Sequence, residues 1–161
     1  MTTTRSALIS TLEQTHPKLV HLTAALNDEA LDYRQDADEW TIREILAHLV
    51  DDEMFIMRTR LERIIKEDVP SLVSHDEKYW YSQRNKGRDQ VGELLHDFAI
   101  QRAASLNILT FLRDSEWVRK AYHPEYDHFT AEEWVGHWAE HDTVHIAQIE
   151  RNIASWQAAL A

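Results

Sequence analysis

Residues 137–148 read HWAEHDTVHIAQ, and they place His137, His141 and His145 at two successive spacings of four. The stretch contains no Gly or Pro, so a helix can run through it without a break. Residues four apart on an α-helix lie one turn above each other on the same face. His141 and His145 can therefore direct both imidazoles at one ion, as the two histidines of H-E-x-x-H do.

A mononuclear metal site needs at least one further ligand, and the best candidate lies far upstream. His48 belongs to REILAHLVDDE, on a second stretch of helical character. That stretch opens with a capping box, Thr41 followed three residues later by Glu44. Three histidines from two helices, with the other positions open to water, would make a reactive site rather than a closed structural one.

Each of these patterns also has a simpler explanation. Ten histidines in 161 residues are a rich supply, and an i,i+4 pair can arise on a solvated helix face. A lone histidine on an apolar helix face, such as His48, is usually a satisfied core residue. The neighbouring acids Glu44, Asp51 and Asp52 could hold the second N–H of a ligating imidazole or a ligand water, or they could simply be solvated. The roles of Asp51, Asp52 and His137 stay open.

Helical periodicity extends along most of the chain. Apolar residues recur at helical spacing over residues 4 to about 27, 41 to about 66, 89–113 and 130 to about 156. Pro17 is expected to kink the first stretch or to split it in two, and a second capping box, Thr130 with Glu133, opens the last stretch. Three Gly and three Pro in the whole chain agree with an all-α protein. Irregular segments are expected between the second and third helices and between the third and fourth.

Composition limits the class of protein. A length of 161 residues with 43% hydrophobic residues fits one domain, residues 1–161. No segment has the apolar length of a membrane span, and the first ten residues carry no apolar core of a signal peptide, so we expect a cytoplasmic protein. Without cysteine, any metal site must use histidines and carboxylates. A formal net charge of −11 argues against nucleic acid and anionic membranes as partners.

With these residues placed, the chain resembles the DinB/YfiT-like superfamily of metal-dependent proteins. The resemblance covers most of the chain and is sharpest in EWTIREILAHLVDDE, residues 39–53, and FTAEEWVGHWAEHDTVHIAQIER, residues 129–151. The family pattern has a tryptophan and a helix cap, then a histidine on the second helix, then H-x-x-x-H on the last helix. This sequence matches that pattern at Trp40, Thr41, His48, His141 and His145.

The resemblance implies an all-α four-helix bundle, with a long loop between helices 2 and 3 and another between helices 3 and 4. It also implies that His48, His141 and His145 bind one divalent metal ion, zinc or nickel, with water completing the shell. His137 has no counterpart in this triad and is expected to line a pocket or to support the ligands. A homodimer is one open possibility for the assembly.

Relatives in this superfamily include transferases and isomerases that use low-molecular-weight thiols such as bacillithiol, mycothiol or glutathione. The leading expectation is therefore a metal-dependent enzyme acting on a small-molecule substrate, namely a thiol S-transferase whose sulfur comes from a cofactor. The alternatives are a metal-dependent hydrolase and a non-catalytic, stress-related metal- or ligand-binding bundle. A pocket is expected to be walled by some of Trp134, His137, Trp138, Tyr79, Trp80 and Tyr81, with Arg84, Lys86 or Arg88 available for carboxylates.

Overall fold

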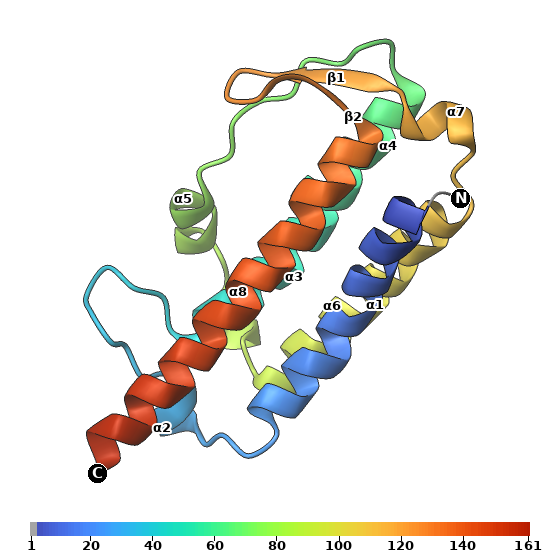
Figure 1. Cartoon of the computed structure of the whole chain (residues 1–161). Helices are drawn as coiled ribbons and strands as arrows, with labels where there is room; N and C mark the ends of the chain where they lie inside the picture. The colour runs from blue at the N-terminus through green and yellow to red at the C-terminus, as the bar shows by residue number, and fades with distance from the viewer. Residues whose placement is uncertain (1–2) are drawn as a thin grey trace.

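Four long helical segments form the body of the molecule in the computed structural model, which describes residues 3–161 (Figure 1). They are α1 (Thr3–Thr23), α3 (Ile42–Asp52) continued by η1 (Glu53–Arg58) and α4 (Thr59–Lys66), α6 (Val91–Thr110) and α8 (Ala131–Leu160). α1 packs against α6 and α8, and α3 packs against the same two helices. The expected all-α four-helix bundle is confirmed.

Both capping boxes are present as the sequence predicts. The Thr41 hydroxyl accepts from the backbone N–H of Glu44 at 3.1 Å, and the Glu44 carboxylate accepts from the backbone N–H of Thr41 at 2.9 Å. Thr130 and Glu133 make the same exchange at 3.2 and 2.7 Å. Each exchange satisfies two backbone groups that the first turn of a helix leaves without a partner, so both ligand-bearing helices begin at a defined residue.

Of the two outcomes expected at Pro17, a kink or a split, the split is wrong, because α1 runs unbroken through this residue. Pro17 removes one intrahelical hydrogen bond, but Leu12 and Leu19 on either side of it are fully buried. Their packing in the bundle offsets that loss. The helix ends at Thr23, earlier than expected, and Asn27 caps the separate one-turn helix α2 (Asp28–Leu31) by accepting from the N–H of Ala30.

The two long connections contain structure that periodicity did not predict. The first holds α5 (Glu77–Ser82) and the 3₁₀ turn η2 (Lys86–Arg88), and the second holds α7 (Asp114–Trp117) and a hairpin of β1 (Lys120–His123) and β2 (Asp127–Thr130). The hairpin is antiparallel. Its strands have four residues each, too few for an alternating pattern to stand out in sequence.

A polar layer divides the interior of the bundle. One apolar cluster lies beside the hairpin and includes Leu12, Met57, Leu109 and Trp134; a second fills the other end and includes Leu19, Ile45, Phe98 and Ile149. Between them, every long helical segment contributes buried polar residues: Thr15, Asp52, Glu53, Arg102 and Asp142. Six residues of π-helix, Glu53–Arg58, begin at this level, and such segments often occur at functional sites.

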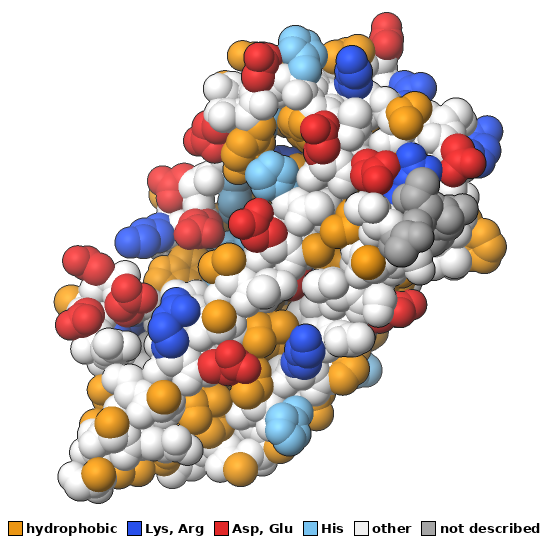
Figure 2. Space-filling view, viewed as in Figure 1, with side chains coloured by type: hydrophobic (Ala, Val, Ile, Leu, Met, Phe, Trp, Pro, Cys, Tyr) orange, Lys and Arg blue, Asp and Glu red, His pale blue; other side chains and the backbone are white. Residues whose placement is uncertain are grey.

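The surface of one face carries a hollow in which histidine side chains are visible, with acidic side chains around it (Figure 2). None of the helices within residues 3–161 combines the length and the apolarity that crossing a membrane requires.

Candidate metal centre

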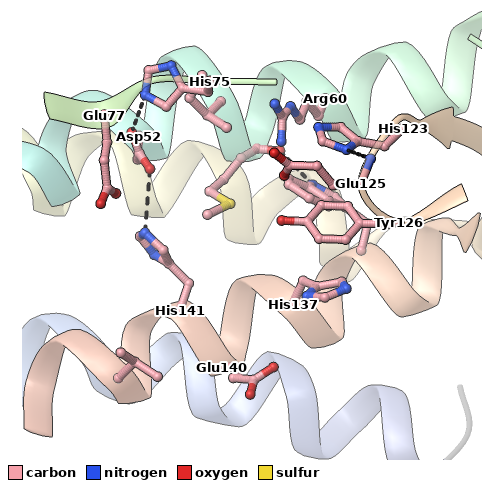
Figure 3. Close-up of a pocket in the computed structure, with 14 residues that line it drawn as sticks. Asp52, Arg60, His75, Glu77, His123, Glu125, Tyr126, His137, Glu140 and His141 are labelled. Carbon is pink, nitrogen blue, oxygen red and sulfur yellow. Dashed lines mark hydrogen bonds and ion pairs between the residues drawn. The ribbon is translucent and has the colours of Figure 1, made fainter. Parts of the chain in front are cut away.

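A cavity of about 290 Å³ lies between the start of α8, the α3–α4 segment, the hairpin and the chain around α5 (Figure 3). Its size suits a small molecule. One end is formed by Asp52, Glu77 and His141, and the other by Arg60, His123 and Tyr126, with Trp134 and His137 among the walls.

The three predicted ligands meet at the inner end of this cavity. His48 on α3 and His141 and His145 on α8 direct their Nε2 atoms at one another: the Nε2 of His48 lies 3.1 Å from that of His141 and 3.1 Å from that of His145. All three ligand atoms lie within 4.8 Å of one another. Two nitrogens bound to one ion at about 2.05 Å would lie about 2.9 Å apart at a right angle and about 3.3 Å apart at a tetrahedral angle. The observed spacing therefore fits a shared divalent ion.

A hydrogen bond at the far side of one ring supports the same assignment. The Nδ1 of His145 lies 2.9 Å from the Oε1 of Gln148, one turn further along α8. Because an amide oxygen can only accept, Nδ1 carries the proton and the lone pair is left on Nε2. His48 is held by the indole of Trp40, edge-on at 4.8 Å between ring centroids, and Asn152 donates to the Trp40 carbonyl at 2.7 Å.

Electrostatics leave two of the three imidazoles neutral. Burial, together with the neighbouring histidines, lowers the pKa of His48 to about 3, and burial and the charge on His141 lower the pKa of His145 to about 4. For His141, burial acts in the same direction, but the carboxylates of Asp142 and Asp52 outweigh it and raise the pKa to about 9. At neutral pH the metal-free cluster therefore carries one positive charge, an additional proton on His141, and an ion would replace that proton.

Two carboxylates face the same point. The Oδ2 of Asp52 lies 3.4 Å from the Nε2 of His141 and 3.5 Å from that of His48. Glu77, which reaches the site from α5, places its Oε2 3.4 Å from the Nε2 of His48. The second oxygen of Asp52 lies 3.3 Å from the Nε2 of His75. Oxygen donors thus adjoin the three nitrogens, and this mixed set suits zinc, nickel and similar divalent ions.

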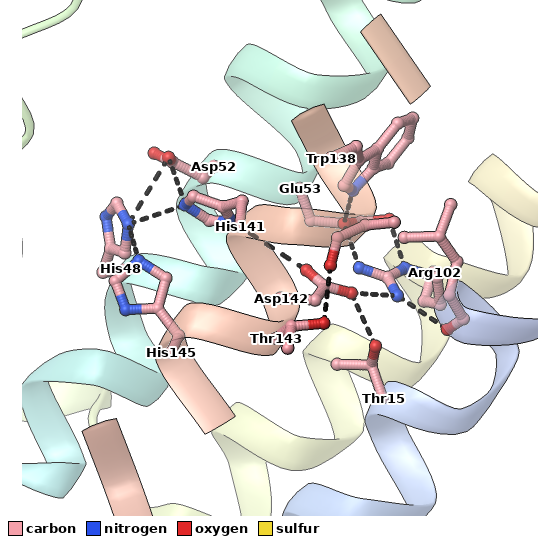
Figure 4. Close-up of polar contacts among 12 residues, drawn as sticks. Thr15, His48, Asp52, Glu53, Arg102, Trp138, His141, Asp142, Thr143 and His145 are labelled. Carbon is pink, nitrogen blue, oxygen red and sulfur yellow. Dashed lines mark hydrogen bonds and ion pairs between the residues drawn. The ribbon is translucent and has the colours of Figure 1, made fainter. Parts of the chain in front are cut away.

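Behind the histidines, a buried charge network joins all four helical segments (Figure 4). Arg102 on α6 binds both carboxylate oxygens of Glu53 at 2.8 Å and the Oδ2 of Asp142 at 2.7 Å. Thr15 on α1 donates to the same oxygen of Asp142, and the indole N–H of Trp138 donates to Glu53 at 3.0 Å. One cation faces two anions here, so the network carries a net negative charge directly behind His141.

That excess charge is oriented towards the metal centre. The free oxygen of Asp142, Oδ1, lies 3.8 Å from the Nδ1 of His141, and neither atom has a hydrogen-bond partner among the described residues. Both are buried. A small movement of the His141 ring would join them, and the carboxylate would then hold the imidazole with its Nε2 turned to the ion, as carboxylates behind metal-ligating histidines do.

Several acids and bases expected near the site have other roles. Asp51 pairs with Arg84, whose guanidinium also binds Asp89, so Arg84 is not available for a substrate carboxylate. Glu44 forms the helix cap and binds Arg34.

The expected pocket walls are correct only in part. Trp134 and His137 line the cavity, but the other expected wall and charge residues do not: Trp138, Tyr79, Trp80, Tyr81, Lys86 and Arg88. Trp138 is instead fully buried in the core, where its indole N–H is satisfied by Glu53. The aromatic residues of α5 face other surface grooves.

Sequence reasoning also missed residues of the site. Glu77, His75 and Arg60 gave no signal, since each is a single polar residue. The places of Glu77 and His75 depend on how the connection before α6 folds back over α3, and Arg60 is one of several arginines on α4 and its flanks. His123, on the hairpin strand β1, also lines the cavity.

Comparison with known proteins identifies the family. Residues 11–149 match the model of the DinB superfamily. The chain is 30% identical over 145 residues to the Bacillus subtilis protein named "Putative metal-dependent hydrolase YfiT", covering 88% of this chain and 79% of the relative. It is 28% identical over 145 residues to the Oceanobacillus iheyensis protein OB0782, which has the same descriptive name, covering 83% of this chain and 77% of that protein.

A solved structure agrees with the sequence comparisons. The structure of YfiT from Bacillus subtilis, described as having an unusual four-helix bundle topology, superposes with a TM-score of 0.83. The two chains share 25% sequence identity, over 94% of this chain and 87% of that one. From its four-helix bundle, its cluster of three histidines and these relatives, the chain belongs to the DinB superfamily.

Proposed function

We propose that this protein is a metal-dependent hydrolase of small molecules, with His48, His141 and His145 as the ligands of one divalent ion. The observation that carries the proposal is the meeting of three Nε2 atoms at ion-binding spacing, beside two carboxylates and at the end of a cavity. The names of two relatives point to the same class of reaction.

A divalent ion at this site would supply Lewis acidity and make a water molecule easier to deprotonate. The chain's own part in hydrolysis is to hold and move the proton. Glu77 is placed for this, because its Oε2 reaches the centre of the site while its side chain stays half exposed at the cavity. Burial and the charge of Asp52 raise the pKa of Glu77, which makes its carboxylate a better proton acceptor near neutral pH. Asp52, held near His75, orients the ligands.

Transfer to a low-molecular-weight thiol is the second candidate. The absence of cysteine from the chain is compatible with it, because a cofactor would have to bring the sulfur. Hydrolysis is favoured over it because Arg84, expected to bind the carboxylates of such a cofactor, is already occupied by Asp51 and Asp89. A carboxylate base beside the metal centre is also what hydrolysis needs.

The test compares two substitutions of the same kind in one cavity. We expect the metal-loaded protein to hydrolyse members of a panel of small esters, amides and phosphoesters. Glu77→Gln should lower kcat by about 10²–10⁴-fold, the usual contribution of general base catalysis, with metal content unchanged. Glu140→Gln removes an exposed carboxylate from the same cavity and should stay near the native rate.

The proposal would fail if no member of the panel were hydrolysed by protein of verified metal content. Equal losses in the two variants would remove Glu77 from the role of base. Turnover of an electrophile only in the presence of bacillithiol, mycothiol or glutathione would favour thiol transfer instead.

A further inference from the structure

Arg60 lies at the outer end of the cavity and has no carboxylate partner among residues 3–161. Its guanidinium is half-buried over the ring of Trp134, at 5.2 Å from the centroid, and one Nη2 donor binds the carbonyl of Val73 at 2.5 Å. By contrast, Arg43, Arg84 and Arg102 each bind two carboxylates. In a chain with 28 acidic residues and a net charge of −11, a fixed and unpaired guanidinium that faces a cavity is an unusual arrangement.

A second donor beside it is also unused. His123 on β1 is 1% exposed and lines the same cavity. Its Nδ1 accepts from the backbone N–H of Glu125 at 3.1 Å, so the proton of the neutral ring is on Nε2. That Nε2 is buried and meets no described residue at hydrogen-bonding geometry, although the Val73 carbonyl is near enough to act on its N–H. A buried donor without an acceptor is costly and calls for an explanation.

The pKa of His123 is lowered chiefly by burial and next by the charge of Arg60, which lies close to it. Glu125 and the Val73 carbonyl act in the opposite direction and have smaller effects. His123 is therefore kept neutral, with Nε2–H as a donor only. Tyr126 closes this end by stacking on His123, at 4.6 Å between centroids, and on His137 at 4.8 Å. Figure 3 shows Arg60, His123 and Tyr126 grouped at the end opposite Asp52 and His141.

Among the described carboxylates that line the cavity, Glu125 alone lies at the Arg60 end, where its charge acts on both Arg60 and His123, and its exposure to water weakens its competition with a bound anion (Figure 3). Asp52 and Glu77 lie at the metal centre, and Glu140 and Glu125 are exposed. Glu125 accepts from the Ser74 hydroxyl at 3.3 Å and forms no ion pair with Arg60. Arg60 follows Asp52 by eight residues on one helical segment, which places the two Cα atoms roughly 12 Å apart along the axis.

We propose that Arg60 and His123 form an anion subsite, which binds a carboxylate or phosphate group of the substrate while the bond to be cleaved lies at the three histidines. The planar guanidinium can offer two parallel N–H donors to such a group, and the His123 Nε2–H a third. Only the statement that the bond to be cleaved lies at the three histidines rests on the proposed hydrolase function. It specifies the substrate class as small molecules with an anionic group several bonds from the cleaved ester or amide.

Anion binding can be measured without turnover. Nuclear magnetic resonance titrations of the metal-loaded protein would use benzoate and inorganic phosphate as probes, with benzamide as the uncharged analogue of benzoate. We expect Arg60→Met to weaken binding of at least one anion about tenfold or more and to leave benzamide unchanged. Arg151→Met makes the same charge change at an exposed position on α8 and serves as the control. Which anion binds decides between a carboxylate and a phosphate group.

Anions can also bind a metal ion directly, so a second variant separates the two sites. His145→Ala removes a proposed ligand that does not line the cavity, and anion binding should survive in it. Loss of binding in His145→Ala with no change in Arg60→Met would overturn the proposal, as would absence of anion binding to the native protein. If Arg60→Met does not fold, Arg60→Lys keeps the charge but loses the fork, and undiminished binding of both anions there would contradict the proposal. Anion binding does not depend on hydrolysis, so either proposal can fail without the other.

Discussion

Arg102 is the residue whose replacement should most affect the stability of the bundle. Its side chain is 2% exposed and forms ion pairs with both Glu53 and Asp142, which are each 1% exposed. Arg102→Met keeps much of the volume but leaves two buried carboxylates without their cation. Removing one member of a buried ion pair costs about 3–5 kcal/mol. For a chain of this length that corresponds to a fall in melting temperature of roughly 6–20 °C.

The pH dependence of the loss tests its cause. In the native protein, burial acts to raise the pKa of Asp142. The charge of Arg102 and the hydrogen bonds that Asp142 accepts outweigh burial, so the pKa of Asp142 lies below its usual value. Asp142 therefore contributes stability that is lost as the pH falls through its pKa. In Arg102→Met the charge that most lowers the pKa of Asp142 is gone, while burial, the Thr15 hydroxyl and His141 remain, so the folded-state pKa rises and protonation destabilises the fold less than in the native protein. The difference in unfolding free energy between the two proteins should therefore shrink from pH 7 to pH 4.5.

Urea unfolding followed by circular dichroism at several pH values gives both quantities. Arg58→Met is the matched control, because within residues 3–161 the Arg58 side chain bonds only Gln101 and is partly exposed. This substitution should cost about 1 kcal/mol or less. A loss below about 1 kcal/mol for Arg102→Met, or a loss that is the same at all pH values, would refute the view that Arg102 acts through buried charge.

Four further outcomes concern the metal centre. His48→Ala, His141→Ala and His145→Ala should each lower metal content in elemental analysis, and a variant with undiminished metal would exclude that residue as a ligand. Gln148→Leu should weaken metal binding about 10–100-fold in competition with a chelator, whereas native affinity would show that the bond to His145 Nδ1 is unimportant. The pKa of His141 is about 9, and those of His48 and His145 are about 3 and 4. Metal binding should therefore release about one proton, and the apparent metal affinity should fall about tenfold for each pH unit from pH 8 to pH 5. A metal affinity that is independent of pH would contradict an all-histidine ligand set. Chelation should remove the stabilisation that metal binding adds to the free energy of unfolding, roughly 3–4 kcal/mol at a free metal concentration of 100 to 1,000 times Kd, and so lower the melting temperature. The helical circular dichroism should remain at room temperature. Loss of the helices on chelation would instead show that the metal site is structural.

What could be predicted from the sequence was what local patterns encode. Both capping boxes and the periodicity of the long helices act within a few residues, and the histidines at positions 141 and 145 share a face by helical geometry alone. His48 could be named as a candidate from its own helical stretch, and the family resemblance supplied the tertiary relation that pairs it with them. The part missed has the opposite character: Glu77, Arg60 and His123 come from three segments with no shared pattern.

Arg102 shows the same limit within a helix. In sequence it is one polar residue in α6, and most arginines lie at the surface. Its burial depends on Glu53 and Asp142 reaching it from two other helices. Periodicity indicates which side of a helix is apolar, but it does not reveal a buried cation whose ion-pair partners lie far away in the chain.

Two pairs of adjacent residues link the polar layer to the cavity. Asp52 and His141 face the metal centre. The next residue after each, Glu53 and Asp142 respectively, points to a different side of its helix and binds Arg102 on α6. A rotation of either helix that adjusted the ligands would therefore also pull an anion away from its buried cation. The groups at the candidate metal centre are in this way held by a buried charge network, so a change in the orientation of either helix carries an electrostatic cost.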